Sequence, residues 1–189
     1  TGATVTNSAG GVWETAGGTL TMAGAWDNSA GTLLVSSGTL NLGGTFTTAQ
    51  LGSLQNTSGT TNLTGTLTNT GSTLALNATT RSINLVGGAI VNGTVTGAGG
   101  FGLAMPFNVT GTLDGVTLAA DLSLTDAANL TVKNGLKLQD TTKVTLNSAG
   151  NTTSLDFSGT QMLEHTGTGT AEVVFGGSST ANFVRPTAG

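Results

Sequence analysis

The sequence predicts an all-β chain that coils into a triangular parallel β-solenoid with three short strands in each turn. Three observations predict this fold. Apolar and polar residues alternate with a period of two, which is typical of strands that are buried on one side. Similar segments recur along the chain with a spacing of roughly 20 to 25 positions. Glycine, 31 of 189 residues, falls between the segments with Asn and Ser, where left-handed corners are needed.

The first half of the chain repeats with an almost constant spacing. Three segments align when they begin at Gly18, Gly38 and Gly59. The alignment superposes two columns of apolar side chains, Met22, Leu42 and Leu63, and then Trp26, Phe46 and Leu67. We therefore expect each column to form an inward stack along the solenoid.

The second half of the chain also repeats with a similar spacing, but its repeats contain different residues. Three apolar-polar-apolar triplets match three others that lie one repeat later: 116–118 with 136–138, 122–124 with 144–146, and 130–132 with 155–157. Three triplets per repeat predict three strands per turn and about nine turns in all. No stretch of the sequence carries the apolar spacing of a helix.

We expect one solenoid domain over residues 1–189, with an irregular turn around 97–107. The glycine-rich run 97–100 predicts a loop, and Pro106, which has no N–H to donate, predicts a corner. The first residues already follow the repeat pattern and carry no leader segment. The chain is therefore expected to be a fragment of a longer protein.

The composition excludes several classes of function. Only 7% of residues are charged, the net charge is −4, and five cations cannot neutralise many phosphates, so nucleic acid is not an expected partner. There is no cysteine for a disulfide framework. No apolar run is as long as the roughly 18 residues that a membrane-spanning helix needs, so no membrane span is expected. Neither a nucleophile elbow nor a phosphate-binding loop is present, and we expect no cofactor.

The acidic residues do not predict a catalytic pair. A β-solenoid that cleaves polysaccharides needs paired or clustered carboxylates, and the sequence contains no Asp-Asp and no Asp-x-Asp. The nearest cluster is Asp114, Asp121 and Asp126, which we interpret as corner residues, with a weak calcium site as the alternative. Lys133, Lys137 and Lys143 follow and are expected to pair with these acids across turns. The single histidine, His165, lacks the partners that a catalytic site needs.

Repeated Thr-x-Thr triplets predict the one candidate binding surface. Each triplet follows a glycine and places two threonines outward on a strand, and the six residues are Thr45, Thr47, Thr66, Thr68, Thr94 and Thr96. Stacked threonines of this kind resemble the ice-binding face of antifreeze solenoids and could also bind glycans. The alternative is that threonine is simply a good exposed strand residue that pairs with itself.

Four segments resemble the repeats of large secreted bacterial surface proteins. They are GTLNLGGTF at 38–46, LDGVTLAADLSLT at 113–125, NLTVKNGLKL at 129–138 and VVFGGS at 173–178. The group includes autotransporter passengers and filamentous-haemagglutinin-like exoproteins. The resemblance implies a right-handed parallel β-helix, export to the cell surface and adhesion. It brings no family active-site pattern to this chain.

These observations together predict a structural stalk or adhesin segment of an exported bacterial surface protein, without enzymatic activity. The expected partners are a glycan, a host surface or other cells, and the open ends of a solenoid also allow end-to-end self-association. Two alternatives stay open. One is a polysaccharide-acting β-helix enzyme whose catalytic turns lie outside these residues, and the other is an ice- or glycan-binding threonine face.

Overall fold

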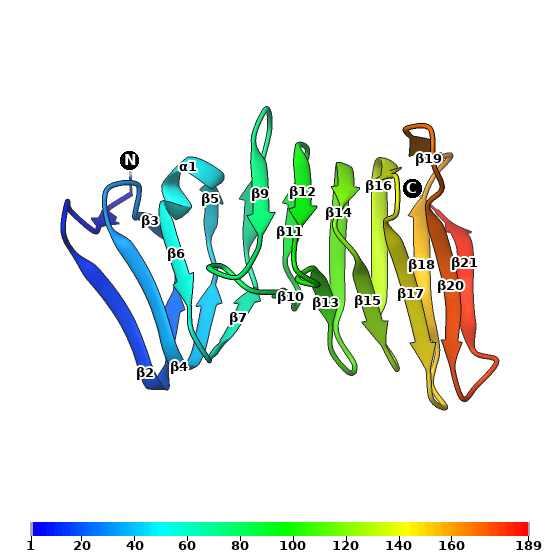
Figure 1. Ribbon diagram of the computed structural model, residues 1–189, viewed down its shortest axis with the longest axis horizontal. Coiled ribbons are helices and arrows are strands. Elements are labelled where there is room, and N and C mark those ends of the chain that lie inside the picture. Colours follow the sequence, from blue (N-terminus) through cyan, green and yellow to red (C-terminus); the bar gives the residue numbers. More distant parts are fainter. Residues whose placement is uncertain (1, 189) are drawn as a thin grey trace.

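The computed structural model describes residues 2–188 and shows an all-β chain wound as a parallel β-solenoid of about seven turns (Figure 1). The strands run across the long axis of the rod, and strands that are one turn apart in sequence lie side by side. The prediction of nine turns is not confirmed, because the eight strands stacked along one face enclose seven turns. At about 4.8 Å per turn these span roughly 34 Å.

Three faces can be followed along the rod. The first face holds β2 (Val12–Met22), β4 (Thr32–Leu42), β7 (Thr60–Leu63), β10 (Ile83–Leu85), β13 (Leu103–Met105), β15 (Leu122–Thr125), β17 (Lys143–Ser148) and β20 (Glu172–Gly177). The second face holds β1 (Thr4–Thr6), β3 (Ala25–Asp27), β5 (Thr45–Thr47), β8 (Thr66–Thr68), β11 (Ala89–Val91), β14 (Thr110–Ala119), β16 (Asn129–Gln139), β18 (Thr153–Ser158) and β21 (Asn182–Thr187). Its ladder is continuous from β5 to β21, whereas β1 and β3 form a separate two-stranded ladder that no pairing among the described residues joins to β5.

The third face is shorter and shares strands with the other two. It holds β6 (Ser53–Asn56), β9 (Thr73–Leu76), β12 (Thr94–Gly97) and β19 (Leu163–Thr166). The long strands β2, β4, β14 and β16 bend around a corner, so that part of each belongs to this face. The only helix in residues 2–188 is α1 (Thr48–Leu51), which is capped by Thr47.

The strand pairing confirms the repeats that the sequence predicts. Leu20 pairs with Leu40 and Met22 with Leu42, and the next turn continues from Leu42 to Leu63. The three triplet matches of the second half are also confirmed. They are 116–118 with 136–138, 122–124 with 144–146, and 130–132 with 155–157.

The core is a narrow stack of side chains that alternate inward along each strand. Trp26 and Phe46 are both 1% exposed, and their ring centroids lie 4.5 Å apart. The indole Nε1 of Trp26 donates a hydrogen bond to the carbonyl oxygen of Gly43 at 2.8 Å. Leucine and valine continue the stack through the later turns, and each buried side chain contributes roughly 1.5–3 kcal/mol. A narrow core that Leu and Val side chains can fill explains why few aromatic residues suffice.

Glycine is required where successive turns touch backbone to backbone. A Cβ added to Gly44 would lie 2.1 Å from the carbonyl oxygen of Gly24, and one added to Gly65 would lie 2.1 Å from that of Gly44. Gly24 and Gly44 also have positive φ, of 67° and 71°. This contact explains why a glycine occupies the position before the second-face strand in successive repeats.

The third face is interrupted near the middle of the rod. Strand β6 pairs with β4 and strand β9 pairs with β12, but among the described residues no ladder joins β6 to β9. The loops that follow β9 and β12 cross the front of the molecule here (Figure 1). The segment around 97–107 contains the second of these loops, at 98–102, and Pro106 follows directly after β13.

Within residues 2–188, no helix has the length and apolar character that a membrane crossing would require.

Candidate functional site

The threonine array that the sequence predicts is only two turns deep. Thr45 pairs with Thr66 and Thr47 with Thr68 on the second face. The next strand of that face places Ala89 beside Thr66 and Val91 beside Thr68. These four threonines therefore form a small patch, and the next strand along the face continues it with the apolar residues Ala89 and Val91 instead of threonine.

Thr94 and Thr96 do not belong to this patch. They lie in β12 on the third face, where they pair with Thr73 and Ala75. The alignment of Thr94 and Thr96 with the other four threonines is therefore wrong. The error has a physical cause, because strands on both faces begin with a Thr-x-Thr triplet after glycine, and alternation alone does not distinguish two exposed faces.

The acidic cluster also separates in the structure. Asp114 Oδ1 accepts a hydrogen bond from Asn134 Nδ2 at 2.6 Å, and Asp121 Oδ1 accepts one from the backbone N–H of Lys143 at 2.9 Å. Each carboxylate thus holds a residue of the following turn. In the part of the chain that the structure describes, no three His, Cys, Asp or Glu side chains gather as a metal site.

Asp126 is the most fully bonded carboxylate of the three. It is buried and accepts hydrogen bonds from the backbone N–H groups of Ala149 and Asn151, at 2.7 and 2.9 Å, and from Asn151 Nδ2 at 2.7 Å. The side-chain bond from Asn151, followed by these backbone bonds, lowers the pKa of Asp126. Asp126 therefore acts as a clamp on the corner between β17 and β18.

The cations pair with other acids than the sequence predicts. Lys137 Nζ lies 3.2 Å from Glu164 Oε2, and Lys143 Nζ lies 3.1 Å from Glu172 Oε2. Near the end of the rod, Arg185 Nε lies 2.7 Å from Asp156 Oδ1. All three pairs join adjacent turns, and the exposed lysine pairs contribute little to stability.

His165 makes a contact of the same kind. Its Nε2 lies 2.6 Å from Asp140 Oδ1, and Asp140 also accepts hydrogen bonds from the backbone N–H groups of Thr168 and Gly169. The bond to His165 is the main reason that the pKa of Asp140 is lowered. The pair closes a surface loop, and no nucleophilic side chain bonds to His165 within residues 2–188.

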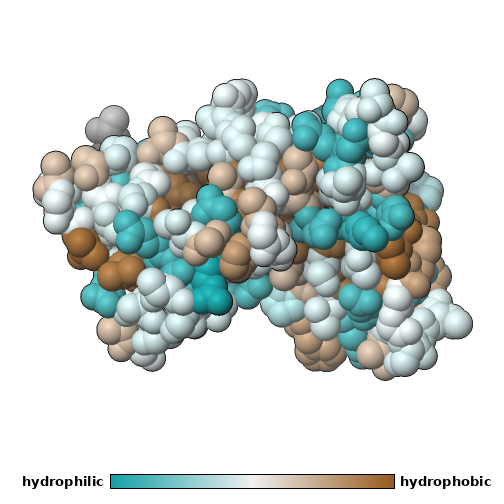
Figure 2. Space-filling model, in the orientation of Figure 1, coloured by the Kyte–Doolittle hydropathy of each residue, from teal (hydrophilic) through white to brown (hydrophobic). Residues whose placement is uncertain are grey.

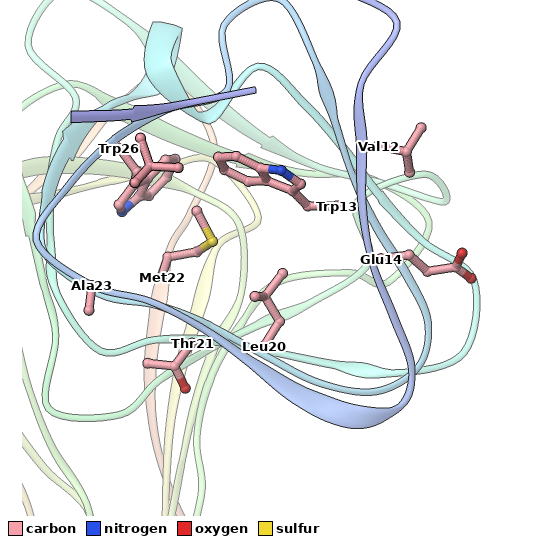
Figure 3. Close-up of a pocket in the computed structure, with 9 residues that line it drawn as sticks. Val12, Trp13, Glu14, Leu20, Thr21, Met22, Ala23 and Trp26 are labelled. Atoms are coloured by element: carbon pink, nitrogen blue, oxygen red, sulfur yellow. The ribbon is translucent and has the colours of Figure 1, made fainter. Parts of the chain in front are cut away.

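An apolar hollow of about 430 Å³ opens at the N-terminal end of the core (Figure 3). Trp13, Leu20 and Met22 point into it, whereas Glu14 points away. The bottom of the hollow is formed by Met22 and Trp26, which belong to the hydrophobic core that continues through the rod. Brown, hydrophobic residues also gather at both ends of the rod in Figure 2, while its sides are mostly white and teal.

A second hollow, a polar groove of about 310 Å³, lies beside the interruption of the third face. The residues that line it come from three segments that are far apart in sequence, and they are Asn56, Ser58, Gly59, Thr60, Thr61, Arg81, Ser82, Asn84 and Phe101. The outline of the molecule narrows at its middle in Figure 2. We call this hollow the Arg81 groove.

A ladder of asparagine side chains leads into the Arg81 groove along the first face. Asn41 Nδ2 donates to Thr21 Oγ1 at 3.2 Å, Asn62 Nδ2 to Asn41 Oδ1 at 2.9 Å, and Asn84 Nδ2 to Asn62 Oδ1 at 3.1 Å. The next residue in this column is Ala104, which has no donor. The ladder therefore ends with Asn84 Oδ1, which accepts no hydrogen bond among the described residues.

Arg81 has an unusual backbone for a long side chain. Its φ is 57°, in the left-handed region that glycine and asparagine prefer, and such a conformation costs about 1–3 kcal/mol. Its Nη1 donates a hydrogen bond to the carbonyl oxygen of Thr57 across the interruption. None of the described residues that line the groove is acidic.

The Arg81 groove could not be predicted from the sequence. Its lining residues lie in separate segments, at 56–61, 81–84 and 101, which only the coiling brings together. The one available signal is the irregular turn that the sequence predicts around 97–107, which contains Phe101.

The chain matches no protein-family model, no curated protein and no solved structure.

Proposed function

We propose that this chain is a structural rod segment of an exported bacterial surface protein, that it holds and presents an adhesive surface, and that it has no enzymatic activity. The observation that carries the proposal is the stack of parallel ladders through about seven turns over one continuous apolar core. Such a stack resists unfolding along its length and leaves its sides free for contact. Those sides offer uncharged Thr and Asn side chains over most of the rod.

The roles of the acidic residues support a non-enzymatic function. Asp126 clamps a corner, and three other carboxylates, those of Asp156, Glu164 and Glu172, pair with cations of the adjacent turn. Carboxylates that are engaged in this way hold turns together rather than activate a water molecule or protonate a leaving group. An enzymatic function would need catalytic turns outside these residues.

The resemblance of the repeats to secreted surface proteins supports export and adhesion. We also infer that the coil is right-handed, because crossovers between parallel strands of one sheet are right-handed in about 98% of cases. Circular dichroism does not report this handedness, so a crystal structure is its direct test.

A binding and turnover panel tests the proposed function. The purified chain would be applied to immobilised acidic and neutral polysaccharides, host-matrix proteins and whole bacterial cells, and the release of new reducing ends would be measured in parallel. Saturable binding without release is the expected result. Release of reducing ends would refute the non-enzymatic assignment, and failure to bind any surface would refute the adhesive one.

We further propose that copies of the chain associate end to end. Val5 at one end is 62% exposed, and Phe175 at the other is 58% exposed. Both lie in columns whose neighbours in the adjacent turn are buried in the core, Trp26 beside Val5 and Leu146 beside Phe175. A second copy stacked on either end would cover these side chains and pair the open strand edges.

A further inference from the structure

We propose that the Arg81 groove is a binding site for an acidic sugar, whose carboxylate is held by the guanidinium of Arg81. The inference deepens the adhesive part of the proposed function and rests on it. The groove has a volume of about 310 Å³ and is open along one side of the rod. This volume is at the lower end of the range for ligand pockets and suits about one or two sugar rings.

Charge is the first argument. Three of the five cations, Lys137, Lys143 and Arg185, pair with an acid of the adjacent turn. Arg81 makes no ion pair in residues 2–188, and every other residue that lines its groove is uncharged. In a chain of net charge −4, the groove is thus a local cationic site. The planar fork of a guanidinium matches a carboxylate with two parallel hydrogen bonds.

The remaining lining residues fit a sugar better than a simple anion. Phe101 is partly buried against the core and offers an apolar surface on which the C–H groups of a sugar ring can pack. Ser58 and Thr60 are exposed residues of another lining segment. Ser58 Oγ donates to the carbonyl oxygen of Ser36 at 2.8 Å, so it offers an acceptor, whereas the hydroxyl of Thr60 can donate or accept. Asn84 Oδ1 is the free acceptor at the end of the asparagine ladder and can accept from a sugar hydroxyl.

The backbone at Arg81 is the second, independent argument. At most positions with positive φ the chain uses glycine, and asparagine fills three of the others. Arg81 is the only charged residue with positive φ in the described part of the chain. Glycine would fit this turn with less strain, so the turn does not require arginine. What arginine adds there is its guanidinium, which donates through Nη1 to Thr57, and Arg81 is one of the residues that line the groove.

The test measures binding of three probes by isothermal titration calorimetry. They are the hyaluronan disaccharide of glucuronic acid and N-acetylglucosamine, the methyl ester of that disaccharide, and inorganic sulfate. The disaccharide should bind saturably, and the uncharged ester should bind at least tenfold more weakly. Sulfate is an anion like the disaccharide but has no sugar rings, so it should also bind at least tenfold more weakly than the disaccharide.

Two variants of Arg81 separate binding from folding. Arg81→Gln and Arg81→Gly should both weaken binding of the disaccharide at least tenfold, while the glycine variant relieves the backbone strain and keeps or raises the melting temperature. The matched control is Lys133→Gln, which removes an exposed cation that makes no ion pair within residues 2–188. It should leave the affinity unchanged.

Several results would overturn the inference. They are wild-type affinity in Arg81→Gln, equal binding of acid and ester, equal binding of sulfate and disaccharide, or no binding of the disaccharide to the wild-type chain. The failure of the groove is distinguishable from the failure of the proposed function. A chain that binds a surface in the panel equally well with Arg81→Gln keeps its adhesive role and loses this site, whereas a chain that binds no surface loses the role itself.

Discussion

Phe46→Ala probes the inward stack at its best-defined point. Phe46 is 1% exposed, and its ring lies 4.5 Å from that of Trp26, centroid to centroid, at an angle of 36°. In the next turn it pairs with Leu67, which is equally buried. The substitution removes a ring that is stacked between the side chains of the two neighbouring turns. A narrow core has few side chains that could move into the space, so a cavity would remain.

The expected loss is large compared with the stability of a domain. A buried Phe→Ala substitution costs about 3–5 kcal/mol, of which the aromatic pair accounts for about 0.5–1.5 kcal/mol. A chain of this length melts about 2–4 °C lower for each kcal/mol, so we expect a decrease of roughly 6–20 °C. Phe46→Asp should destabilise further, because it places a charge in the core without a partner.

Urea unfolding followed by tryptophan fluorescence is the appropriate assay. Trp13 and Trp26 both lie in the first turns, so the signal reports on the region that contains Phe46. Phe107→Ala is the matched control, since Phe107 is 61% exposed and its loss should change stability by no more than about 0.5 kcal/mol. A loss below about 1 kcal/mol for Phe46→Ala would refute the inward stack.

Four further predictions concern the rest of the molecule. Far-UV circular dichroism should show β-structure with almost no helix, and a substantial helical signal would contradict the fold. Because hydrogen bonds hold the pKa of Asp126 below its ordinary value of 3.8, its carboxylate stabilises the fold above that pH, and this contribution is lost as the pH falls through the lower folded pKa. Asp126→Asn should therefore be less stable than the wild type at neutral pH in urea unfolding, and the difference should shrink below about pH 4; a difference that does not change with pH would argue against the clamp. Thr66→Tyr should leave the melting temperature unchanged. If the patch of Thr45, Thr47, Thr66 and Thr68 is a binding face, this variant should lose binding to ice in an ice-growth assay or to the immobilised polysaccharides; unchanged binding of both would exclude the patch. In sedimentation velocity the wild-type chain should associate as its concentration rises, and Val5→Lys or Phe175→Lys should weaken that association; a wild-type chain that is monomeric at all concentrations would refute end-to-end stacking.

Much of the fold could be predicted because each repeat carries its own register. A large apolar residue recurs at 26, 46 and 67, and a glycine precedes each of these strands at the same distance. The alignment of the repeats therefore predicts the pairing of Phe46 with Leu67 and of Met22 with Leu42. The offsets between matching triplets in the second half predicted the pairing for the same reason.

The number of turns and the third threonine pair could not be predicted in the same way. Alternation shows which side chains point outward but not toward which of the three faces, so the sequence places Thr94 on the face of Thr66 although the two lie on different faces. The Arg81 groove depends on an interruption of one ladder, which is a property of contacts between turns. No single repeat contains it.

The pairing of every strand with residues one turn away has a consequence for how such a chain can change over evolutionary time. A duplication or deletion of one whole repeat recreates the same kinds of contact at the new junction, with apolar on apolar and Gly44 on Gly24. Natural selection can thus change the length of the rod in steps of about 4.8 Å without changing how the core is packed. The Arg81 groove is inherited differently, because a copied repeat lengthens the rod but does not reproduce the broken ladder that shapes the groove.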